Sequence, residues 1–460
     1  MQLPASCLNE LHKILGKDGL KTDKEELVCY SYDATGKSFL PGAVVFPKSE
    51  EQISQVLKLA NKNHFHVTPR GSGSGMTGGS VPVKGGVVMV LSQLNKIINI
   101  DTDNLIAIVE PGVITGDLHS AVEAEGLFYP PDPASSAFCT IGGNIGECAG
   151  GPRAVKYGVT RDYVLGLRAV LPTGQTIKTG VATSKGVAGY DLTRLIIGSE
   201  GTLAVVSEIT LKLIAKPEKV KTMALLFDKI DHAANIVPAI IKKGVIPRCI
   251  EFMDKASLDC VKNNISFELD DKVEALLIIE LDGDSQLVDN DYNKLMGFFN
   301  NRNILNIISA DNQKEAAELW KARKSLSPAL FKIASGKINE DIVVPVKKIP
   351  EMVKKIELLK NESKLFIASF GHAGDGNIHC NIMYNKQNPD ELLRAKKTVD
   401  KLFAYTLDLG GTITGEHGIG ITKMKYLPDE IGNIEIQIMK KIKEVFDPEG
   451  ILNPGKIFQG

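Results

Sequence analysis

The sequence lacks the features that mark proteins specialised for nucleic acids or for membranes. Its 54 Lys and Arg nearly balance 55 Asp and Glu, which gives a formal net charge of -1. A balance of this kind gives no reason to expect nucleic acid as a partner. No apolar run approaches the roughly 20 residues that a transmembrane helix needs, so we expect no transmembrane segment. The first residues show no basic segment followed by an apolar run, so we also expect no signal peptide.

Cysteine is scarce and irregularly spaced. The chain holds seven cysteines, an odd number, and none lie in C-x-x-C spacing. The sequence therefore shows no motif for an iron–sulfur cluster or a structural zinc site, and it has no haem attachment motif. Reduced thiols in a cytoplasmic protein are the simplest interpretation, so we expect a cytoplasmic location.

The rest of the composition is that of an ordinary globular protein. Hydrophobic residues make up 43% of the chain and charged residues 24%. A chain of 460 residues is too long for one core, so we expect two or three domains.

Two glycine-rich runs, residues 370–379 and 410–420, carry the strongest chemical signal. His372, His379 and Glu416 supply two imidazoles and a carboxylate, the ligand set of a catalytic zinc or a related divalent ion with one position open. His417 would remain beside that ion, with an imidazole suited to proton transfer near neutral pH. The alternative is a pair of glycine-rich turns with structural histidines.

A third glycine-rich run, residues 69–79, matches G-x-G-x-x-G at Gly73, Gly75 and Gly78. A Rossmann site needs a helix directly after these glycines, but residues 80–91 are strand-like and broken by proline and glycine. The sequence therefore predicts an anion-binding nest of backbone N–H groups, with a flexible hairpin as the alternative. A second small-residue loop is expected at 140–151. Two such loops suit a long ligand with phosphates and a flat ring system.

The hydrophobic pattern predicts a β-α-β opening: a strand at 44–47, a helix after the capping box at 49–52, and a strand at 66–69. A hairpin is expected over 164–179. From about residue 220, strands alternate with helices, which is typical of an α+β domain with an antiparallel sheet. Trp320, Arg323 and Ser327 are spaced to share one helical face. Arg323 there could bind a carboxylate or form a surface salt bridge.

Four segments (69–79, 140–151, 198–202 and 452–455) resemble the flavin domain shared by vanillyl-alcohol oxidase and p-cresol methylhydroxylase, within the FAD-linked oxidase family. Residues 371–379 and 415–418 are similar to one branch of that family. The branch contains the glycolate oxidase flavoprotein subunit, FAD-dependent D-lactate dehydrogenases and D-2-hydroxyglutarate dehydrogenases. The match runs from roughly residue 31 to the C-terminus.

The resemblance implies an α+β protein: a two-subdomain p-cresol methylhydroxylase-type FAD-binding domain, a substrate (cap) domain with an antiparallel sheet, and a C-terminal segment that returns to the flavin domain. The expected bounds are 1–35 for an N-terminal helical segment, 36–217 for the FAD-binding domain, 218–410 for the cap and 411–460 for the C-terminal segment.

The resemblance also implies roles for single residues. Residues expected to hold the FAD pyrophosphate are Arg70, Gly71, Ser72, Gly73, Ser74, Gly75 and Thr77. Those expected along the ribityl and flavin portions are Asp132, Ser136, Thr140, Gly143 and Asn144. Glu200, Thr202 and Ile209 would lie by the adenosine half, and Asn453 near the isoalloxazine. His372, His379 and Glu416 match the metal ligands of the branch, and His417 its catalytic base. Arg323 matches the arginine that binds the substrate carboxylate, with Ser327 and Lys337 near it.

The implied activity is oxidation of a D-2-hydroxy acid to the 2-oxo acid, with D-lactate preferred over glycolate and D-2-hydroxyglutarate. FAD would be non-covalent, because the 69–79 run has no histidine to tether it, and the metal would be zinc, iron or manganese. Electrons would leave to an electron-transferring flavoprotein or an iron–sulfur subunit. The alternatives are a metal-dependent hydrolase that uses the same histidines and glutamate, and a non-catalytic flavin subunit that relays electrons.

Overall fold

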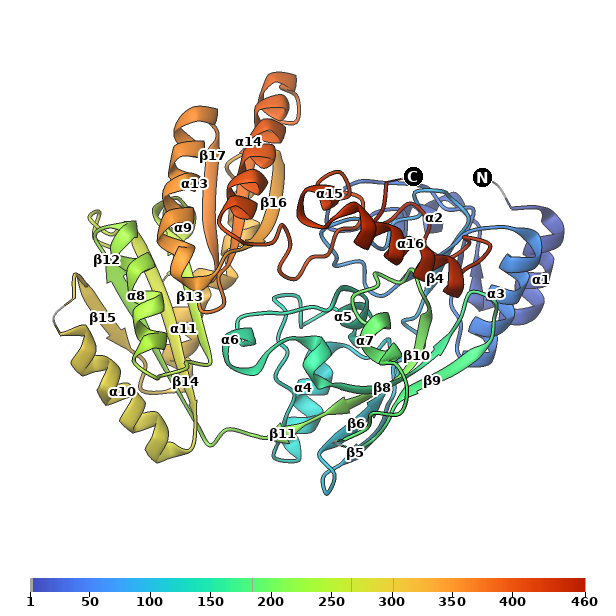
Figure 1. The fold of residues 1–460 in the computed structure, drawn as a ribbon, viewed down its shortest axis with the longest axis horizontal. Helices are drawn as coiled ribbons and strands as arrows, with labels where there is room; N and C mark the ends of the chain where they lie inside the picture. The colour runs from blue at the N-terminus through green and yellow to red at the C-terminus, as the bar shows by residue number, and fades with distance from the viewer. Residues whose placement is uncertain (1–2, 184, 266, 301, 460) are drawn as a thin grey trace. The chain divides into compact units, whose positions relative to one another are not determined.

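The computed structural model describes residues 3–183, 185–265, 267–300 and 302–459. It divides into two compact units (Figure 1). The first unit consists of Met1–Ala149, Val159–Lys216 and Glu416–Gly460, and the second of Gly150–Gly158 and Pro217–Gly415. Each unit therefore gathers segments that are far apart in the sequence.

The first unit opens with a four-stranded sheet in the order β1-β2-β4-β3. Its strands are β1 (Leu20–Lys21), β2 (Ala43–Val45), β3 (Val67–Arg70) and β4 (Val87–Val90). β2 and β3 both run parallel to β4, and α3 (Glu50–Asn63) connects β2 to β3, which confirms the predicted β-α-β opening.

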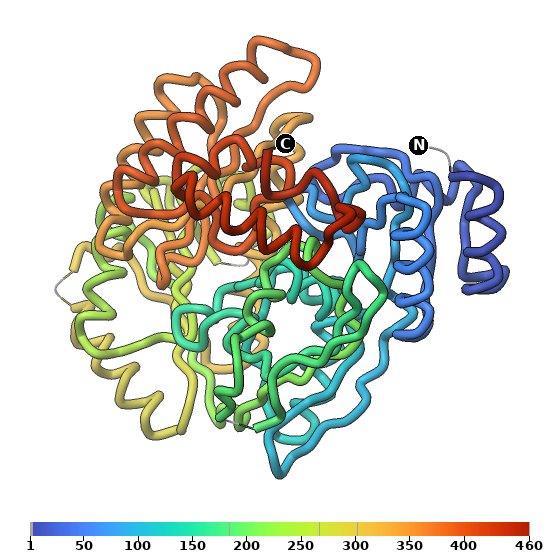
Figure 2. Tube along the Cα trace, turned by 45° about the vertical axis from the view of Figure 1, so that its right-hand side comes forward, coloured from blue at the N-terminus to red at the C-terminus, as the bar shows by residue number. Residues whose placement is uncertain are grey.

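Apolar packing explains the position of the first helix. α1 (Ala5–Leu15) lies beside α3 in both Figure 1 and Figure 2. Leu11 and Leu15 of α1 and Ile53 and Leu57 of α3 belong to one buried cluster with the sheet. These are the positions that the helical period places on one face.

A second, antiparallel sheet completes the core of the first unit. Its order is β5-β6-β10-β8-β9. The strands are β5 (Ile97–Asp101), β6 (Ile106–Val109), β8 (Val164–Val170), β9 (Thr176–Gly180) and β10 (Val205–Lys212), and β8 with β9 forms the predicted hairpin. A short pair, β7 (Leu127–Phe128) with β11 (Ile214–Ala215), lies outside this sheet. Besides α1 and α3, the α-helices of the first unit are α2 (Lys24–Cys29), α4 (Thr115–Ala124), α5 (Ile141–Glu147), α7 (Leu192–Ile196), α15 (Leu427–Glu430) and α16 (Asn433–Phe446).

The glycine run between β3 and β4 contains no helix, since residues 71–86 form only turns, bends and extended chain. This confirms that the G-x-G-x-x-G match is not a Rossmann site. At the end of the run Gly86 has φ +79°, and a Cβ there would lie 2.2 Å from the His66 carbonyl oxygen. Only glycine fits where the loop returns to the sheet.

The predicted loop at 140–151 is instead mostly helix, so that prediction was wrong. α5 begins after Thr140, whose Oγ1 accepts a hydrogen bond from Gly143 N at 3.2 Å. Ile141 and Ile145 are buried. The cap and these two apolar contacts outweigh the low helix propensity of three glycines.

The second unit is built on a seven-stranded sheet in the order β15-β12-β14-β13-β17-β18-β16, and all of its strand pairs are antiparallel. The strands are β12 (Lys219–Phe227), β13 (Cys249–Asp254), β14 (Ala275–Gly283), β15 (Asn306–Ser309), β16 (Gly336–Val343), β17 (Phe366–His372) and β18 (Asn377–Tyr384). The predicted antiparallel α+β domain is confirmed.

Helices flank this sheet, and α13 and α14 lie side by side (Figure 1). They are α6 (Ala154–Tyr157), α8 (Ile230–Lys242), α9 (Lys255–Val261), α10 (Ser285–Phe299), α11 (Gln313–Lys324), α12 (Leu326–Leu330), α13 (Ile349–Ser363) and α14 (Pro389–Asp408). Across the described parts of both units, no helix has the length and apolar character needed to cross a membrane.

The strand register gathers polar side chains on one face of the sheet. Glu251 lies opposite His372, and His379 lies opposite both Phe370 and Asp341. Because directly opposed residues and residues two apart on a strand share a face, all five point to the same side. This face positions the candidate site.

The predicted common face of Trp320, Arg323 and Ser327 was only partly right. α11 ends at Lys324 and α12 begins at Leu326, so Ser327 belongs to a different helix. The two helices meet at Ser325, whose backbone N–H bonds back to the carbonyls of Lys321 and Arg323.

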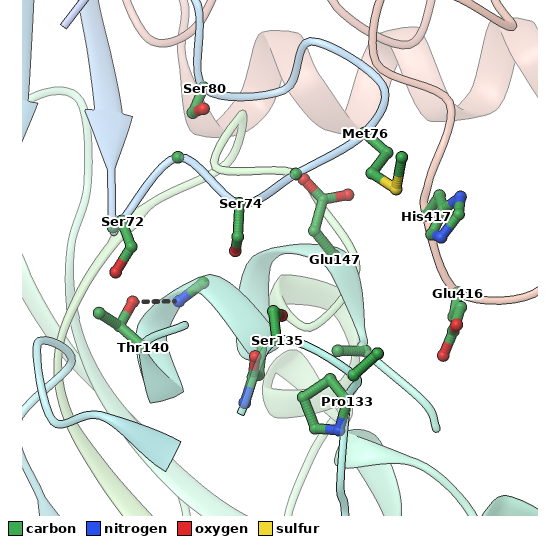
Figure 3. A pocket seen from close by; sticks show the side chains of 17 residues that line it. Ser72, Ser74, Met76, Ser80, Pro133, Ser135, Thr140, Glu147, Glu416 and His417 are labelled. Atoms are coloured by element: carbon green, nitrogen blue, oxygen red, sulfur yellow. Dashed lines mark hydrogen bonds between the residues drawn. The ribbon is translucent and has the colours of Figure 1, made fainter. Parts of the chain in front are cut away.

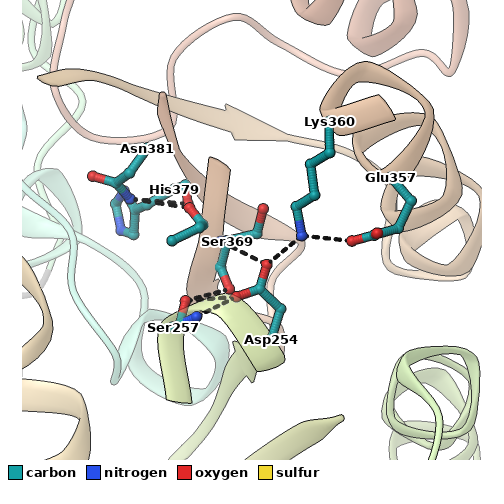
Figure 4. Close-up of polar contacts among 8 residues, drawn as sticks. Asp254, Ser257, Glu357, Lys360, Ser369, His379 and Asn381 are labelled. Carbon is teal, nitrogen blue, oxygen red and sulfur yellow. Dashed lines mark hydrogen bonds and ion pairs between the residues drawn. The ribbon is translucent and has the colours of Figure 1, made fainter. Parts of the chain in front are cut away.

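A buried carboxylate joins three elements of the second unit. Asp254, at the end of β13, accepts hydrogen bonds from the Ser257 and Ser369 backbone N–H groups at 2.8 and 2.9 Å and pairs with Lys360 Nζ at 2.8 Å (Figure 4). Glu357 lies 2.5 Å from the same ammonium. Although burial disfavours the charge, Asp254 and Glu357 together raise the pKa of Lys360. The network holds α9, α13 and β17 together.

We expect Asp254→Asn to destabilise the second unit by about 3–5 kcal/mol, because it removes the buried partner of Lys360 and turns amide hydrogens toward its neighbours. The chain has a single tryptophan, Trp320, in this unit, so urea unfolding followed by its fluorescence reports the change. The control is Asp271→Asn, which breaks an ion pair between side chains that are 92% and 51% exposed and should leave the urea midpoint close to that of the wild type. Equal effects of the two variants would contradict the argument.

Candidate functional site

A cavity of about 190 Å³ opens along the glycine loop of the first unit (Figure 3). Figure 3 shows Ser72 and Ser74 coming from the glycine loop, Ser135 and Thr140 from the segment leading into α5, and His417 from the C-terminal segment. The lining residues are Gly71, Ser72, Gly73, Ser74, Gly75, Met76, Ser80, Pro133, Ala134, Ser135, Thr140, Gly143, Asn144, Glu147, Ala149, Glu416 and His417.

The loop approaches α5 so closely that side chains are excluded. A Cβ on Gly71 would lie 2.3 Å from Thr140 Oγ1. At Gly73 φ is +72°, and a Cβ there would lie 2.1 Å from Arg70 Nη2. Backbone N–H groups can therefore face a ligand directly, as a phosphate-binding loop requires.

The C-terminal segment is hydrogen-bonded to this loop. Thr77 Oγ1 donates to the His417 carbonyl at 2.9 Å, and Ile421 N donates to the Thr77 carbonyl at 2.8 Å. The Glu200 carboxylate accepts the Ile419 and Gly420 N–H groups, each at 2.7 Å. His417 is thereby held at the wall of the cavity through its own carbonyl and through the backbone that follows it.

Glu200 has a different environment from the one the sequence suggested. Its side chain is buried, and burial raises the pKa of its carboxyl against the opposing effect of the two backbone donors. Glu200 also lines a second cavity of about 90 Å³ together with Arg70 and Gly71. Its carboxylate is committed to the 419–420 backbone, so adenosine contacts stay a prediction.

The predicted cofactor residues divide into three groups, of which Arg70 and Glu200 line only the smaller cavity. Those lining the larger cavity are Gly71, Ser72, Gly73, Ser74, Gly75, Thr140, Gly143 and Asn144. Those lining neither of the two cavities are Thr77, Asp132, Ser136, Thr202, Ile209 and Asn453.

Asn453 joins the C-terminal segment to the glycine loop and to the segment at 198–202. Its Nδ2 donates to the Gly79 carbonyl at 2.9 Å and to the Glu200 carbonyl at 2.7 Å. Its φ is +43°, a left-handed conformation that asparagine tolerates better than most residues. Asn453 thus holds the backbone around the cavity, and a contact with the isoalloxazine stays a prediction.

Lys456 places a buried cation in the same region. Its Nζ donates to the Val81 carbonyl, and its side chain faces the carboxylates of Asp33, Glu200 and Glu147. Burial lowers the pKa of the Lys456 ammonium to about 8, and these three carboxylates oppose the shift. Its charge offsets the acidic groups around the C-terminal segment.

In the second unit, His372 and His379 form a close pair on adjacent strands. Their Nε2 atoms are 3.5 Å apart, and their rings lie at 89° with centroids 5.2 Å apart. Both side chains are buried. Two imidazole nitrogens that converge in this way suit a shared divalent ion.

A fully buried carboxylate supports the first of these histidines. Glu251 Oε1 lies 2.5 Å from His372 Nδ1, and Glu251 Oε2 accepts a hydrogen bond from Arg323 Nε at 2.7 Å. Burial opposes ionisation of Glu251, but His372 and Arg323 outweigh it and hold the pKa of the carboxyl below its usual range. Arg323 is therefore in a buried ion pair with side-chain exposures of 12% and 0%, and not in a surface salt bridge.

Ser327 and Lys337 contact each other, and their predicted place near Arg323 and the substrate stays a prediction. Lys337 Nζ donates to Ser327 Oγ at 2.9 Å and lies 4.8 Å from the centre of the Phe331 ring. Burial lowers the pKa of the Lys337 ammonium. Lys337 is on the sheet face that carries His379, four positions from Asp341 on β16.

Glu416 is tied to the second unit through the chain itself. Gly415 N donates to the Asp341 carbonyl at 3.0 Å and to Asp341 Oδ2 at 2.9 Å. Asp341 is the residue opposite His379 in the β16–β18 pair. Gly415, the last residue of the second unit, is therefore anchored to β16, the strand that pairs with β18.

Sequence reasoning missed Glu251 and Glu147. Glu251 is inside the buried strand β13, where a carboxylate flanked by apolar residues requires a cationic or hydrogen-bonding partner, and this was the available signal. Glu147 ends α5 and lines both cavities. Its position within the predicted loop at 140–151 gave no cue to that role.

Comparisons with known proteins identify the family of this chain. Residues 41–180 match the family model described as FAD binding domain, and residues 216–457 match FAD linked oxidases, C-terminal domain. The chain belongs to the FAD-linked oxidase family. It is an FAD-dependent oxidoreductase, and the predicted family and branch are confirmed.

Several relatives resemble this chain over nearly its whole length. The chain is 42% identical to glycolate oxidase subunit GlcD of Bacillus subtilis, covering 98% of this chain and 96% of that protein. It is 38% identical to a D-lactate dehydrogenase of Anaerostipes hadrus (91% and 89% covered). It is 33% identical to a D-2-hydroxyglutarate dehydrogenase of Stutzerimonas stutzeri (98% and 99% covered).

Solved structures support the fold. The flavoenzyme p-cresol methylhydroxylase superposes with a TM-score of 0.80 at 18% identity, covering 98% of this chain and 96% of that chain. Alkyldihydroxyacetonephosphate synthase superposes with a TM-score of 0.78 at 22% identity, covering 99% and 86%. The expected p-cresol methylhydroxylase-type fold is therefore confirmed.

We expect Lys456→Met to change how stability depends on pH. Between pH 8 and 10.5 the folded chain has lost the Lys456 proton while the unfolded chain keeps it, so stability due to this group rises with pH, by at most about 1.4 kcal/mol per unit. Below pH 8 both states are protonated and the contribution is flat. Urea unfolding across pH 7–10.5 should show a shallower rise in Lys456→Met than in the wild type, whereas exposed Lys62→Met should follow the wild type. Parallel curves for Lys456→Met and the wild type would refute this.

Proposed function

We propose that this protein oxidises a D-2-hydroxy acid, preferentially D-lactate, to the 2-oxo acid with FAD and a divalent metal ion. The observation that carries the proposal is the convergence of His372 and His379 at 3.5 Å between Nε2 atoms. A metal-dependent hydrolase would have no need of the flavin domain. A flavin subunit that only relays electrons would have no need of this histidine pair.

The residues of the first unit fit FAD. The backbone of residues 71–75 lies open to the cavity because glycines replace side chains that would collide with Thr140 and Arg70. Ser72 and Ser74 line the same wall. The Ser72 hydroxyl donates to the Phe138 carbonyl, whereas the Ser74 hydroxyl can donate to a phosphate oxygen. The 69–79 segment contains no histidine, so we propose that FAD is held without a covalent bond. When bound, FAD supplies the acceptor for the substrate hydride at N5.

The metal proposal rests on the donor set. His372 and His379 each offer an Nε2, and Glu416 follows the anchored Gly415 directly. Two imidazoles and one carboxylate suit zinc, iron or manganese and leave coordination positions for a substrate. When bound, such an ion acidifies the substrate hydroxyl and fixes its orientation.

The protein's own groups would then share three tasks. Arg323, paired with Glu251 through Nε, keeps its terminal nitrogens for the substrate carboxylate. Ser327 and Lys337 would contact the remainder of the acid. His417, held at the cavity wall by Thr77, would take the hydroxyl proton as the hydride leaves Cα.

The names of the relatives support the substrate class. They describe glycolate, D-lactate and D-2-hydroxyglutarate as the acids concerned, all of them 2-hydroxy acids. We keep D-lactate as the preferred substrate, with the other two as competitors. We further propose that electrons leave to an electron-transferring flavoprotein or an iron–sulfur subunit. The cytoplasmic location stays a prediction.

We expect His417→Ala to lose about 10²–10⁴-fold in the rate of anaerobic flavin bleaching by D-lactate, because no other group takes the hydroxyl proton, while FAD stays bound. Stopped-flow absorbance near 450 nm, roughly where oxidised flavins absorb, measures the rate, and the released chromophore measures FAD content. His12→Ala, on the exposed side of α1, is the matched control. Rapid bleaching of His417→Ala would overturn the proposal. So would the absence of bleaching in the wild type with each of the three acids.

A further inference from the structure

Glu251 connects the two functional groups of the second unit. One of its oxygens is 2.5 Å from His372 Nδ1, and the other is 2.7 Å from Arg323 Nε. The Glu251 side chain has an exposure of 0%. A carboxylate this deeply buried is stable only because both oxygens have cationic or strongly polar partners.

This contact fixes the state of the His372 ring. An ionised carboxylate can only accept hydrogen bonds, so Nδ1 of His372 must carry the proton. A metal-binding imidazole must be neutral, so with Nδ1–H directed at Glu251 the atom left for a metal is Nε2, which faces His379 Nε2. Without an acceptor at Nδ1, the ring could rotate or place its proton on Nε2, and the nitrogen pair would no longer converge as two donors to a cation.

The same carboxylate orients Arg323. The hydrogen bond to Nε uses the inner edge of the guanidinium, and the cation also lies 4.5 Å from the centre of the Phe370 ring. These two contacts fix the plane of the group. Its terminal nitrogens are then free to bind a planar carboxylate through two bonds.

We propose that Glu251 is a positioning residue that sets the His372 tautomer for the metal and the Arg323 plane for the substrate carboxylate at once. The inference rests on the proposed function and adds a residue that touches neither metal nor substrate. It predicts that one substitution weakens two separate binding events.

The neighbouring strand supplies a matched control. Glu280 of β14 is also a buried carboxylate on this face, bonded to Trp320 Nε1 at 2.7 Å and to Thr222 Oγ1 at 2.8 Å. Glu280 contacts the same helix, α11, but forms no hydrogen bond or ion pair with His372 or Arg323. Glu280→Gln therefore reproduces the loss of a buried charge without the proposed positioning effect.

The first measurement is the affinity of the FAD-loaded protein for Zn²⁺, by competition with a chromophoric chelator. We expect Glu251→Gln to weaken binding about 10–100-fold and Glu280→Gln to leave it within about twofold. The absorption spectrum of bound Co²⁺ should change in Glu251→Gln and not in Glu280→Gln. Glu251→Asp keeps the charge but is too short for both partners, so an intermediate loss is expected.

The second measurement is the KM for D-lactate with metal at saturation. It should rise in Glu251→Gln by a larger factor than kcat falls, because Arg323 loses its orientation for the ground state as well as the transition state. A purely structural role would instead lower FAD content and thermal stability, with unchanged metal affinity per folded molecule.

The outcomes separate the two proposals. If the wild type binds Zn²⁺ no better than His379→Ala, the proposed metal-assisted function fails. If the wild type binds Zn²⁺ but Glu251→Gln binds it equally well, only the positioning role fails. Should Glu251→Gln not fold, Glu251→Asp decides, and an unchanged Zn²⁺ affinity in that variant overturns the inference.

Discussion

The cost of burying a charge governs how this protein is assembled. A buried carboxylate without partners would cost several kcal/mol, and the chain buries Asp254, Glu251 and Glu200. Each is satisfied by donors from a distant part of the sequence: Lys360 and Ser369 for Asp254, His372 and Arg323 for Glu251, and the 419–420 backbone for Glu200. Because these partners exist only in the folded chain, the same contacts that make the charges tolerable also fix the loops and strands of the candidate site.

The flavin-domain loops follow a different constraint, which is the space left by missing side chains. Gly71 allows the loop to approach Thr140 at a distance that a Cβ would prevent, and Gly73 supplies a φ of +72° that side chains rarely adopt. Thr140 in turn caps α5 and so cannot be displaced without loss of that helix. The glycine loop and α5 therefore depend on each other, although about seventy residues separate them, and the cavity that they share is a consequence of that packing.

The sequence predicted what is local and repetitive. The β-α-β opening, the 164–179 hairpin and the antiparallel α+β character of the second unit follow from periodicity, and the family follows from motifs. What failed depends on tertiary contacts. The glycine-rich 140–151 segment reads as a loop until the burial of Ile141 and Ile145 is known. The sequence left Arg323 as either a carboxylate-binding residue or a surface salt bridge, because its buried partner Glu251 lies 72 positions earlier and meets it only in the folded chain.

The chemistry is divided between the units in a way that constrains how specificity can change. The first unit holds the flavin cavity and His417, whereas the second holds the imidazole pair, Arg323 and the Ser327–Lys337 contact. Under the proposed function, the groups shared by every 2-hydroxy acid are largely buried: the imidazoles and Glu251 are on inner strands of the sheet, and the Arg323 side chain on α11 is 12% exposed. Ser327 and Lys337 instead come from the short helix α12 and the edge strand β16, where a substitution disturbs less of the core. If the proposed function holds, a change of substrate would therefore cost least stability at that edge, because the inner strands that carry the imidazoles and Glu251 would stay unchanged.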